Sequence, residues 1–368
     1  MGFWPGKYVI GLTGSIGTGK SVIRHMLEQL GALGIDADTL AHRVYARGTT
    51  GIERIRETFG EDEITQDGEV DRLLLARRVF QDAQAMEDLE RIVHPLVIDL
   101  VNDLIVRAPQ KVIVVEAIKL LETELASHCD AVWVVATSPE VHLQRLVQDR
   151  HMSAEAARAR IDAQLSQAER IRHASVVITN DGSLADTWQQ VSAAWENTIP
   201  AKFRKDAPIS RHVTLSLGEG EVAMARLADA AELSGIFSNS GTLAGEDPIR
   251  LVSRSTLFLL RIDNRIRACL MWNAENLVAC AQAFHVNLAL PVDDVFHALV
   301  ISMEVEARRR LCEVSIFPRM EKDGFPTEVL IELGYKPVIL AELERAAWRE
   351  QAQKTIPSAK RFYFKPLP

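Results

Sequence analysis

A phosphate-binding loop is the clearest sign of chemistry in this sequence. Residues 14–21 read Gly-Ser-Ile-Gly-Thr-Gly-Lys-Ser, a complete Gly-x-x-x-x-Gly-Lys-Ser pattern. In such loops the backbone N–H groups bind the β-phosphate, the lysine reaches the outer phosphates and the serine hydroxyl can bind Mg²⁺. An apolar, strand-like run at residues 8–12 precedes the loop, and a helical pattern at residues 21–30 follows it. This context favours a nucleoside triphosphate site over an ordinary glycine-rich turn.

Two aspartates at the end of the next strand-like run offer a second chemical function. Asp36 and Asp38 follow the apolar residues 32–35, and in an α/β kinase this edge of the sheet faces the phosphate-binding loop. Phosphoryl transfer depends mainly on positioning and charge neutralisation, and an ionised aspartate can accept the proton of the attacking hydroxyl. A carboxylate at a strand end also commonly caps the following helix. The residues alone leave these two interpretations equally open.

Alternating strands and helices must position these groups. The predicted strands are residues 8–12, 32–35, 111–115, 131–136 and 175–178, with helical segments between them up to about residue 195. Several of these runs are almost continuous valine and isoleucine, which is typical of parallel strands covered by helices on both faces. With right-handed crossovers, the pattern predicts a doubly wound α/β domain that binds ligands at the carboxyl ends of its strands.

The bulk properties fit a globular protein of two domains. The chain has 368 residues, of which 47% are hydrophobic and 25% charged, and that length favours two domains. A net charge of -8 argues against general affinity for nucleic acid. The N-terminus lacks the apolar core of a signal peptide, and no run is long enough to span a bilayer. The four cysteines are far apart, which indicates a reducing compartment without a disulfide or metal framework, so a cytoplasmic protein is expected.

A change of rhythm near residue 200 indicates a second domain. Residues 200–208 are polar and contain two prolines, as linkers often do. Beyond them the sequence predicts a hairpin around Asp263-Asn264, a third antiparallel strand, a helix, a strand, a short helix and a final strand. The corresponding ranges are 257–262, 265–272, 278–288, 295–310, 313–317 and, for the final strand, about 336–340. The predicted division is a first domain at 1–199, a linker at 200–208 and an α+β domain at 209–368.

An ordered set of motifs resembles the dephospho-CoA kinase family, which phosphorylates the ribose 3′-hydroxyl of dephospho-CoA to complete coenzyme A. The motifs are Gly14–Val22, Ile35-Asp36-Ala37-Asp38 with His42, Asp67-Gly68-Glu69-Val70-Asp71-Arg72 with Val79-Phe80, His94-Pro95-Leu96-Val97, Arg145 with Arg150, Ala163-Gln164 with Glu169, and Ile178-Thr179-Asn180-Asp181-Gly182. Each motif is modest, whereas their order and spacing together are specific. The resemblance covers about residues 7–195 and nothing beyond.

The resemblance implies a P-loop kinase that uses ATP and Mg²⁺ and has a helical lid. It also implies roles for individual residues. Asp38 matches the general base, and Lys20 is the second catalytic residue. The implied ATP-binding residues are Gly14, Gly17, Thr18, Gly19, Lys20, Ser21, Val22, Arg145 and Asn180. The implied substrate-binding residues are Asp36, His42, His94 and Arg150. For His94, a helix stopped by Pro95 is at least as good an interpretation. Ser21 and Glu116 are the implied Mg²⁺ ligands.

Arginines crowd the segment that the resemblance assigns to the lid. They are Arg145, Arg150, Arg158, Arg160, Arg170 and Arg172. A mobile cover that supplies positive charge on closing has this composition, and so has a solvated helix whose arginines pair with neighbouring acidic residues. We expect only the first two or three arginines to contact phosphate.

Several positions depart from the family pattern. Glu116 stands where the family has a shorter aspartate, which would change the register of its water-mediated contact with Mg²⁺. Ile118 and Lys119 follow in the same atypical segment, where Lys119 replaces an apolar residue. Lys119 either adds a cation to the phosphate site or forms a weak surface pair with Glu122. Val22 replaces the usual threonine at the cost of one hydroxyl.

The second domain resembles a degenerate Gcn5-related N-acetyltransferase fold in its order of elements and in its Glu332-Leu333-Gly334-Tyr335 turn. Such folds bind the pyrophosphate of acyl-CoA through a glycine-rich turn at the N-terminus of the central helix. The corresponding residues 287–295 contain no glycine. Asp293 and Asp294 lie at the positive end of that helix, where they would repel a pyrophosphate. We therefore expect a structural or partner-binding role, such as self-association.

The function that follows is ATP-dependent phosphorylation of dephospho-CoA, a small-molecule substrate, without nucleic acid or membrane partners. One alternative is another small-molecule P-loop kinase, of the nucleoside monophosphate type. A second is a catalytically weak sensor of nucleotide or CoA. The pair Asp36 and Asp38, together with His94-Pro95, argues against the first alternative. Retention of Lys20, Ser21 and Asp38 argues against the second.

Overall fold

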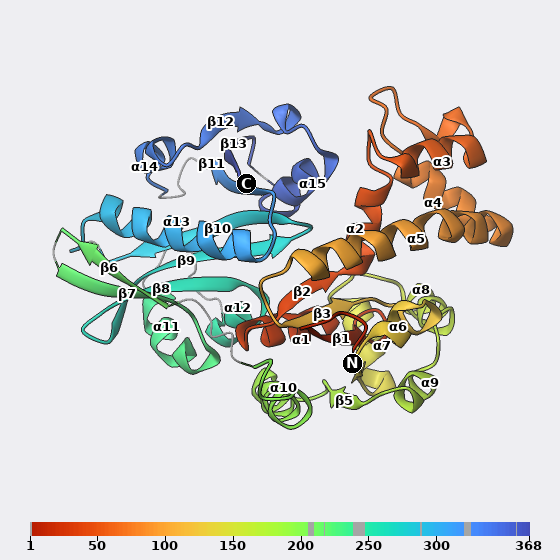
Figure 1. Ribbon diagram of the computed structural model, residues 1–368, viewed down its shortest axis with the longest axis horizontal. Helices are drawn as coiled ribbons and strands as arrows, with labels where there is room; N and C mark the ends of the chain where they lie inside the picture. Colours follow the sequence, from red (N-terminus) through yellow and green to blue (C-terminus); the bar gives the residue numbers. More distant parts are fainter. Residues whose placement is uncertain are drawn as a thin grey trace.

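A five-stranded parallel sheet forms the centre of the first domain (Figure 1). The structure is a computed structural model that describes residues 2–204, 210–216, 218–237, 247–287, 289–319, 325–357 and 359–368. The strands are β1 (Tyr8–Thr13), β2 (Leu33–Asp36), β3 (Val112–Glu116), β4 (Ala131–Ala136) and β5 (Val176–Thr179). Their order in the sheet is β2-β3-β1-β4-β5, and every neighbouring pair is parallel. The predicted doubly wound fold is confirmed, with each strand within one residue of its expected limits.

Helices cover both faces of this sheet. They are α1 (Lys20–Gln29), α2 (Ala37–Val44), α3 (Thr50–Phe59), α4 (Arg72–Gln81), α5 (Ala83–Arg107), α6 (Leu125–His128), α7 (Pro139–Gln148), α8 (Ala154–Asp162), α9 (Gln167–Arg172) and α10 (Leu184–Thr198). Side chains alternate along each strand, so Val9 and Ile113 pack with α2, α3 and α5 on one face. Ile10 and Val112 pack with α1 and α10 on the other face. Because both faces are buried, the strands need the continuous valine and isoleucine runs seen in the sequence.

An eight-stranded sheet forms the second domain, in the order β12-β13-β11-β10-β9-β8-β7-β6. These strands are β6 (Ser210–Leu215), β7 (Gly218–Met224), β8 (Thr256–Ile262), β9 (Arg265–Glu275), β10 (Val278–Val286), β11 (Val314–Arg319), β12 (Lys336–Ile339) and β13 (Arg361–Pro366). β10 and β11 are parallel, and the other neighbours are antiparallel. Asp263 and Asn264 have φ angles of 51° and 59°, as a tight hairpin turn requires. The predicted hairpin and α+β architecture are confirmed.

Helices also cover both faces of the second sheet. They are α11 (Ala230–Phe237), α12 (Pro248–Arg254), α13 (Val292–Arg309), α14 (Thr327–Glu332) and α15 (Ala346–Thr355). α13 packs its Phe296 and Met303 on one face of the sheet, while α11, α12 and α15 pack on the other. The strand predicted near residues 336–340 is β12, but the expectation that it ends the fold was wrong. α15 and β13 follow, and β13 inserts between β11 and β12, a long-range pairing that local sequence does not specify.

The segment predicted as a linker is partly packed against the first domain. Residues 201–204 form a turn after α10, where the ring of Phe203 contacts that of Tyr8 and Arg204 forms an ion pair with Glu196. Residues 205–208 of the predicted linker, and Leu288 of the predicted third strand in the second domain, lie outside the described residues. The exact domain limits stay a prediction.

Two turns of the second domain pack partly buried leucines against the core of the first. Leu277, between β9 and β10, and Leu311, between α13 and β11, pack against the cluster that includes Leu33 and Leu104. Both leucines have a φ of 59°, a left-handed conformation that is uncommon for a residue with a side chain. Beside them, Arg43 of α2 donates to the Asn276 carbonyl at 2.9 Å and forms an ion pair with Glu313. The two domains are therefore joined by specific contacts as well as by the chain itself.

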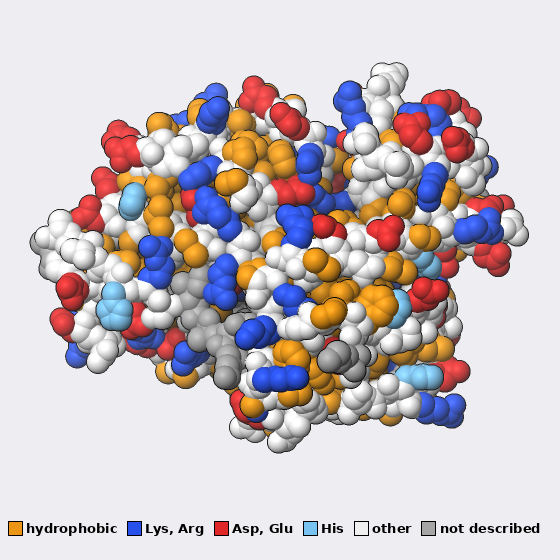
Figure 2. All heavy atoms as spheres, in the orientation of Figure 1, with side chains coloured by type: hydrophobic (Ala, Val, Ile, Leu, Met, Phe, Trp, Pro, Cys, Tyr) orange, Lys and Arg blue, Asp and Glu red, His pale blue; other side chains and the backbone are white. Residues whose placement is uncertain are grey.

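The surface, the helix lengths and the cysteines bear on the remaining bulk predictions. Figure 2 shows acidic, basic and hydrophobic side chains mixed over the face that it draws. Among the described residues, no helix combines the length and apolar character needed to cross a membrane. Cys269, Cys280 and Cys312 are buried and Cys129 is half-buried, and all four thiols are free. The expectation of cysteines without disulfides is confirmed.

Candidate active site

The phosphate-binding loop connects β1 to α1 and needs its glycines for two physical reasons. Gly17 and Gly19 have φ angles of 80° and 94°, in the left-handed region that favours glycine. A Cβ at Gly14 would lie 2.6 Å from the Val135 carbonyl oxygen, and one at Gly19 would lie 2.2 Å from Asn180 Nδ2. The loop therefore keeps the open turn at the start of α1 that the sequence predicts, with backbone N–H groups at the positive end of a helix.

Lys20 lies inside this loop. Its side chain is buried, and Nζ donates to the carbonyl oxygens of Gly14 at 3.0 Å and Ser15 at 3.2 Å. Burial lowers the pKa of Lys20, while the negative charges of Glu116 and Asp38 oppose the shift. Both carboxylates thus lie close enough for their charges to act on the lysine. The structure therefore brings Lys20, Glu116 and Asp38 together, three of the residues that the sequence predicted at the site.

Asn180 and Arg145 both contact the loop at Thr18, although they come from distant segments. Asn180 Nδ2 donates to the Thr18 carbonyl at 2.8 Å, and its Oδ1 accepts from Thr187 of α10 at 3.0 Å. Arg145 of α7 donates to the same carbonyl at 3.4 Å. The Thr18 hydroxyl donates to Ser15 at 2.9 Å. Asn180 therefore helps to fix the loop conformation, and Arg145 reaches the loop. That either residue contacts ATP stays a prediction.

Three further side chains hold the loop, and sequence reasoning did not single them out for that task. Arg170 of α9 is 1% exposed, and it donates to Ser15 Oγ at 2.8 Å and to the Leu165 carbonyl. His142 of α7 donates from Nε2 to the Ile16 carbonyl at 2.6 Å. The Ile16 N–H donates to Gln164 Oε1 at 3.1 Å. The Ala163-Gln164 motif of the sequence indicated that Gln164 belongs to the site. Nothing in the local sequence of His142 indicated its contact with Ile16.

The arginine-rich segment divides into buried and exposed members. Arg170 and Arg145 contact the loop, and Arg158 lines a cavity of about 400 Å³ that also includes Ser15, Thr137 and His142. Arg150 follows α7 and is exposed, so its assignment to substrate stays a prediction. Arg170 reaches the loop although it comes late in the segment, because packing brings α9 back towards the loop. Which arginines contact phosphate stays a prediction.

Asp36 and Asp38 have separate tasks. The Asp36 carboxylate caps α2, accepting from Thr39 N and Thr39 Oγ1, both at 2.9 Å. Asp38, in the first turn of α2, accepts from the Ile118 N–H at 3.0 Å. The helix-cap interpretation is therefore confirmed for Asp36, while the role of Asp38 as proton acceptor stays a prediction. Whether Asp36 also contacts substrate stays a prediction.

The Asp38 carboxyl has an unusual acidity. Although the residue remains accessible to solvent, loss of water around its carboxyl group and then the charge of Asp36 raise its pKa to about 6. The Ile118 N–H and the Lys20 charge partly oppose this shift. A carboxylate with a pKa near the working pH is well suited to accept a proton.

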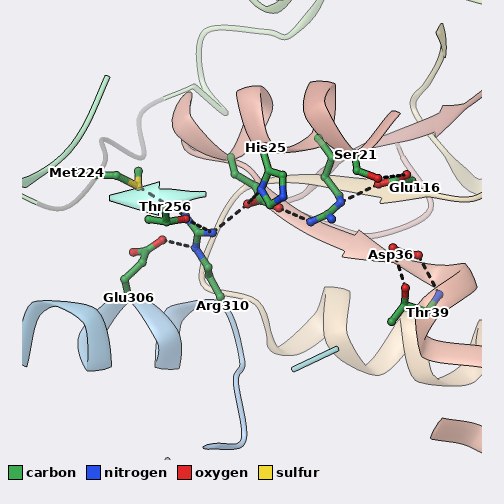
Figure 3. Close-up of polar contacts among 11 residues, drawn as sticks. Ser21, His25, Asp36, Thr39, Glu116, Met224, Thr256, Glu306 and Arg310 are labelled. Atoms are coloured by element: carbon green, nitrogen blue, oxygen red, sulfur yellow. Dashed lines mark hydrogen bonds and ion pairs between the residues drawn. The ribbon is translucent and has the colours of Figure 1, made fainter. Parts of the chain in front are cut away.

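Ser21 and Glu116 form the oxygen-rich corner beside the loop (Figure 3). Glu116 ends β3 directly opposite Asp36 in the sheet register, and Ser21 Oγ donates to Glu116 Oε1 at 2.9 Å. Arg24 Nε donates to the other carboxylate oxygen, Oε2, at 2.8 Å. Within the described part of the chain, no group of three or more His, Cys, Asp or Glu side chains could hold a metal. One hydroxyl and one carboxylate nevertheless fit Mg²⁺, because it usually binds one or two protein oxygens together with phosphates and water.

The atypical residues around Glu116 take partners that the sequence did not predict. Lys119 pairs with Glu90 of α5, so pairing with Glu122 was wrong, because α5 passes closer to this turn. The Ile118 backbone, by contrast, holds Asp38. Val22 packs against the core formed with α1.

His94 lies within a continuous helix. α5 runs from Ala83 to Arg107 with Pro95 inside it, so the idea that Pro95 stops the helix was wrong. The tertiary contacts of the buried residues Val93, Val97 and Val101 keep the helix intact across the proline. His94 is half-buried and follows Glu90 by one turn, which puts it on the face that meets Lys119.

His42 lines a cavity that both domains share. This cavity, of about 300 Å³, is lined by Tyr45, Asp71 and Arg72 of the first domain and by Ala346 and Glu350 of α15. Arg72 lies 3.4 Å from His42 Nδ1 and pairs with Glu350 at 2.8 Å. Burial and the Arg72 charge lower the pKa of His42. A predicted substrate residue thus faces the second domain, which sequence reasoning had not connected with the site.

Comparison with known proteins supports the kinase interpretation. The family model described as dephospho-CoA kinase matches residues 8–186. The dephospho-CoA kinase of Syntrophotalea carbinolica is 37% identical over 195 residues, which are 52% of this chain and 92% of that protein. The one from Streptomyces avermitilis is 40% identical over 191 residues, which are 52% of this chain and 93% of that protein.

The chain is also similar, at low sequence identity, to solved structures of acetyltransferases. The GNAT domain of S. lividans PAT covers 46% of this chain and 99% of its own, at 15% identity and a TM-score of 0.35. A likeness of that size gives no information about a ligand. In this structure Asp293 and Asp294 lie in the first turn of α13 as predicted, and Asp294 Oδ2 accepts from the Ser216 N–H at 3.1 Å.

Proposed function

Since this chain belongs to the dephospho-CoA kinase family, we propose that it transfers the γ-phosphate of ATP to the ribose 3′-hydroxyl of dephospho-CoA, with Mg²⁺. The observation that carries the proposal is the meeting of three groups at one edge of the sheet. Lys20 lies in the loop, Asp38 lies beside it with its pKa raised to about 6, and Glu116 lies next to Ser21. A loop alone would bind nucleotide, whereas the added carboxylate supplies a proton acceptor for an alcohol.

The chemical step divides among the residues as follows. The oxygen of the 3′-hydroxyl bonds to the γ-phosphorus, and Asp38 accepts the proton of that hydroxyl. The bond between the γ-phosphorus and the bridging oxygen of the β-phosphate breaks, which releases ADP. Lys20 and the backbone N–H groups of the loop stabilise the charge that shifts to the phosphates. Arg145 and Arg170 add positive charge from the lid side. Ser21 and Glu116 would hold Mg²⁺, which neutralises phosphate charge when it is bound.

The acceptor is proposed to enter from the side of Asp38, His42 and Arg72. Arg72 offers a guanidinium for an anionic group, and the cavity that it lines with His42 opens between α2 and α15. The cytoplasmic location, and self-association through the second domain, stay predictions.

Substrate choice tests this proposal directly. In an ADP-release assay with ATP and Mg²⁺, we expect turnover with dephospho-CoA and little with AMP, because Asp38 and the His42 cavity serve a ribose hydroxyl on a larger molecule. Turnover with AMP alone would replace the proposal with a nucleoside monophosphate kinase. A chain that binds ATP and turns over neither acceptor would be a sensor.

The pH dependence of kcat/KM should report the acidity of Asp38. The carboxylate must be unprotonated to accept a proton, so kcat/KM should rise with pH and reach half its plateau at about pH 6. Removing the neighbouring charge with Asp36→Asn should move this limb to lower pH, because Asp36 raises the pKa of Asp38. Asparagine caps a helix as well as aspartate does, so α2 should stay folded. A limb that does not move in Asp36→Asn would assign the titration to another group.

A further inference from the structure

A chain of buried ion pairs connects the second domain to the phosphate-binding loop (Figure 3). Arg310, directly after α13, donates to Glu28 Oε2 at 2.9 Å. Glu28 Oε1 accepts from Arg24 at 2.8 Å. Arg24 in turn donates to Glu116 Oε2 at 2.8 Å, and Glu116 Oε1 accepts from Ser21. We call this series, from Arg310 through Glu28 and Arg24 to Glu116, the ion-pair chain.

The members of the ion-pair chain are enclosed by protein. Arg24 is 3% exposed, Glu28 5%, Glu116 4% and Arg310 7%. Burial disfavours the charged form of Glu28, yet the charges of His25, Arg24 and Arg310 together hold the pKa of its carboxyl below its usual range. Buried charges persist only when each is paired and hydrogen-bonded. Each member of the chain therefore depends on its neighbours for its position.

The second domain fixes Arg310 from several sides. Glu306 Oε1 accepts from Arg310 Nε at 2.9 Å, and Thr256 Oγ1 lies 3.2 Å from its Nη1. The guanidinium also lies over the Trp272 ring, 5.3 Å from the ring centre. Leu277 and Leu311 pack against the first-domain core close by in the chain. The side chain of Arg310 is thus held against Glu28 by contacts with residues of the second domain.

Loss of the Arg310 charge would change the contacts of Glu116, because Arg24 connects the two. The guanidinium of Arg24 forms ion pairs with both Glu28 and Glu116. Without Arg310, the ion-pair partner that Glu28 keeps among the described arginines and lysines is Arg24, and the stronger pull of Glu28 would draw Arg24 away from Glu116. Glu116 would then lose the contact that orients one of its two oxygens, while its other oxygen stays on Ser21.

We propose that Arg310 is a positioning residue for the Mg²⁺–nucleotide site, which it reaches through the ion-pair chain. This inference rests on the proposed function, in which Ser21 and Glu116 hold the metal. Glu28, Arg24 and Glu116 lie within the part of the chain that matches the kinase family, residues 8–186, whereas Arg310 lies beyond it. The second domain then contributes to nucleotide binding without containing a nucleotide site of its own.

The test compares ATP binding with and without metal in the full-length protein. In Arg310→Met, calorimetry should show the Kd for ATP with Mg²⁺ raised by about tenfold, the lower end of the loss typical when a residue that orients a metal ligand is removed. The Kd for ATP in EDTA should change less than twofold, because the backbone N–H groups of the loop and Lys20 bind the phosphates without Glu116. Arg310→Lys keeps the charge and should recover part of the loss.

A matched control separates this effect from general damage to the domain interface. Glu313→Gln breaks the interdomain pair with Arg43, which has no contact with the ion-pair chain, and should leave both Kd values unchanged. Equal changes with and without Mg²⁺ in Arg310→Met, or no change in either, would make Arg310 a structural residue only. If Arg310→Met does not fold, Arg310→Gln, which removes the charge and keeps a polar side chain beside Glu28, must show the same selective loss. A wild-type protein that binds ATP equally with and without Mg²⁺ would instead count against the proposed metal site.

Discussion

Replacement of Asp38 by asparagine is expected to lower kcat by about two to four orders of magnitude, the usual contribution of a general base. Asparagine keeps an oxygen that can accept from the Ile118 N–H, as Asp38 does at 3.0 Å, so the local structure should persist. The variant lacks only the ability to take the proton of the 3′-hydroxyl. The Kd for ATP should stay near the wild-type value, because Asp38 does not contact the loop backbone. Steady-state kinetics and calorimetry on the same preparation measure both quantities.

Asp36→Asn is the matched control for this prediction. It removes a carboxylate two residues away and keeps the cap of α2, since asparagine is as good an N-cap as aspartate. We expect its kcat to fall far less than that of Asp38→Asn. Similar losses in the two variants, or near-normal turnover in Asp38→Asn, would remove Asp38 from the proposed mechanism.

Replacement of Lys20 by methionine should have the next largest effect, a fall in kcat of about two to three orders of magnitude, as for loss of one preorganised charge stabiliser. Lys20 is buried within the loop, and its charge is the one that the loop itself directs at the outer phosphates. Methionine fills a similar volume without a charge, so the loop should remain folded. Methionine also removes the Nζ donor of the Gly14 and Ser15 carbonyls, so the thermal unfolding of the variant is measured beside its kinetics.

Lys119→Met controls for the loss of any lysine near the carboxyl ends of the strands. Lys119 pairs with Glu90 on α5, and such partly exposed pairs contribute about 0–1 kcal/mol. We expect kcat and the KM for ATP to change by less than a factor of about three. A large loss of activity in Lys119→Met would show that this lysine serves the phosphates after all.

Much of the first domain could be predicted from sequence because its signals are local. A buried parallel strand needs a run of apolar residues, and the loop after β1 needs glycine at positions with left-handed backbone. These requirements are met within a few neighbouring residues, so the five strands and the loop were predicted almost to the residue. The hairpin at Asp263-Asn264 was predicted for the same reason, since both residues adopt a positive φ.

The partners of the site residues could not be predicted in this way. Arg170 reaches Ser15 across 155 positions of sequence, and His142 reaches Ile16 across 126. Nothing in the local pattern separates Arg170 from the exposed arginines around it. The different contacts of Asp36 and Asp38 also required the structure, because Asp38 accepts from the N–H of Ile118, which lies 80 positions away in the turn after β3.

The sequence by itself determined that the chain has a phosphate-binding loop, a parallel sheet to carry it and a carboxylate at the neighbouring strand end. Short-range backbone and packing requirements encode all three. Only the tertiary structure decided what the second domain does for the site. Glu28 and Arg310 are 282 positions apart, and each looks like an ordinary surface charge of an amphipathic helix until the domains meet. Their pairing arises because the packed interface excludes water from both charges, which is a property of the assembled fold and of no single segment.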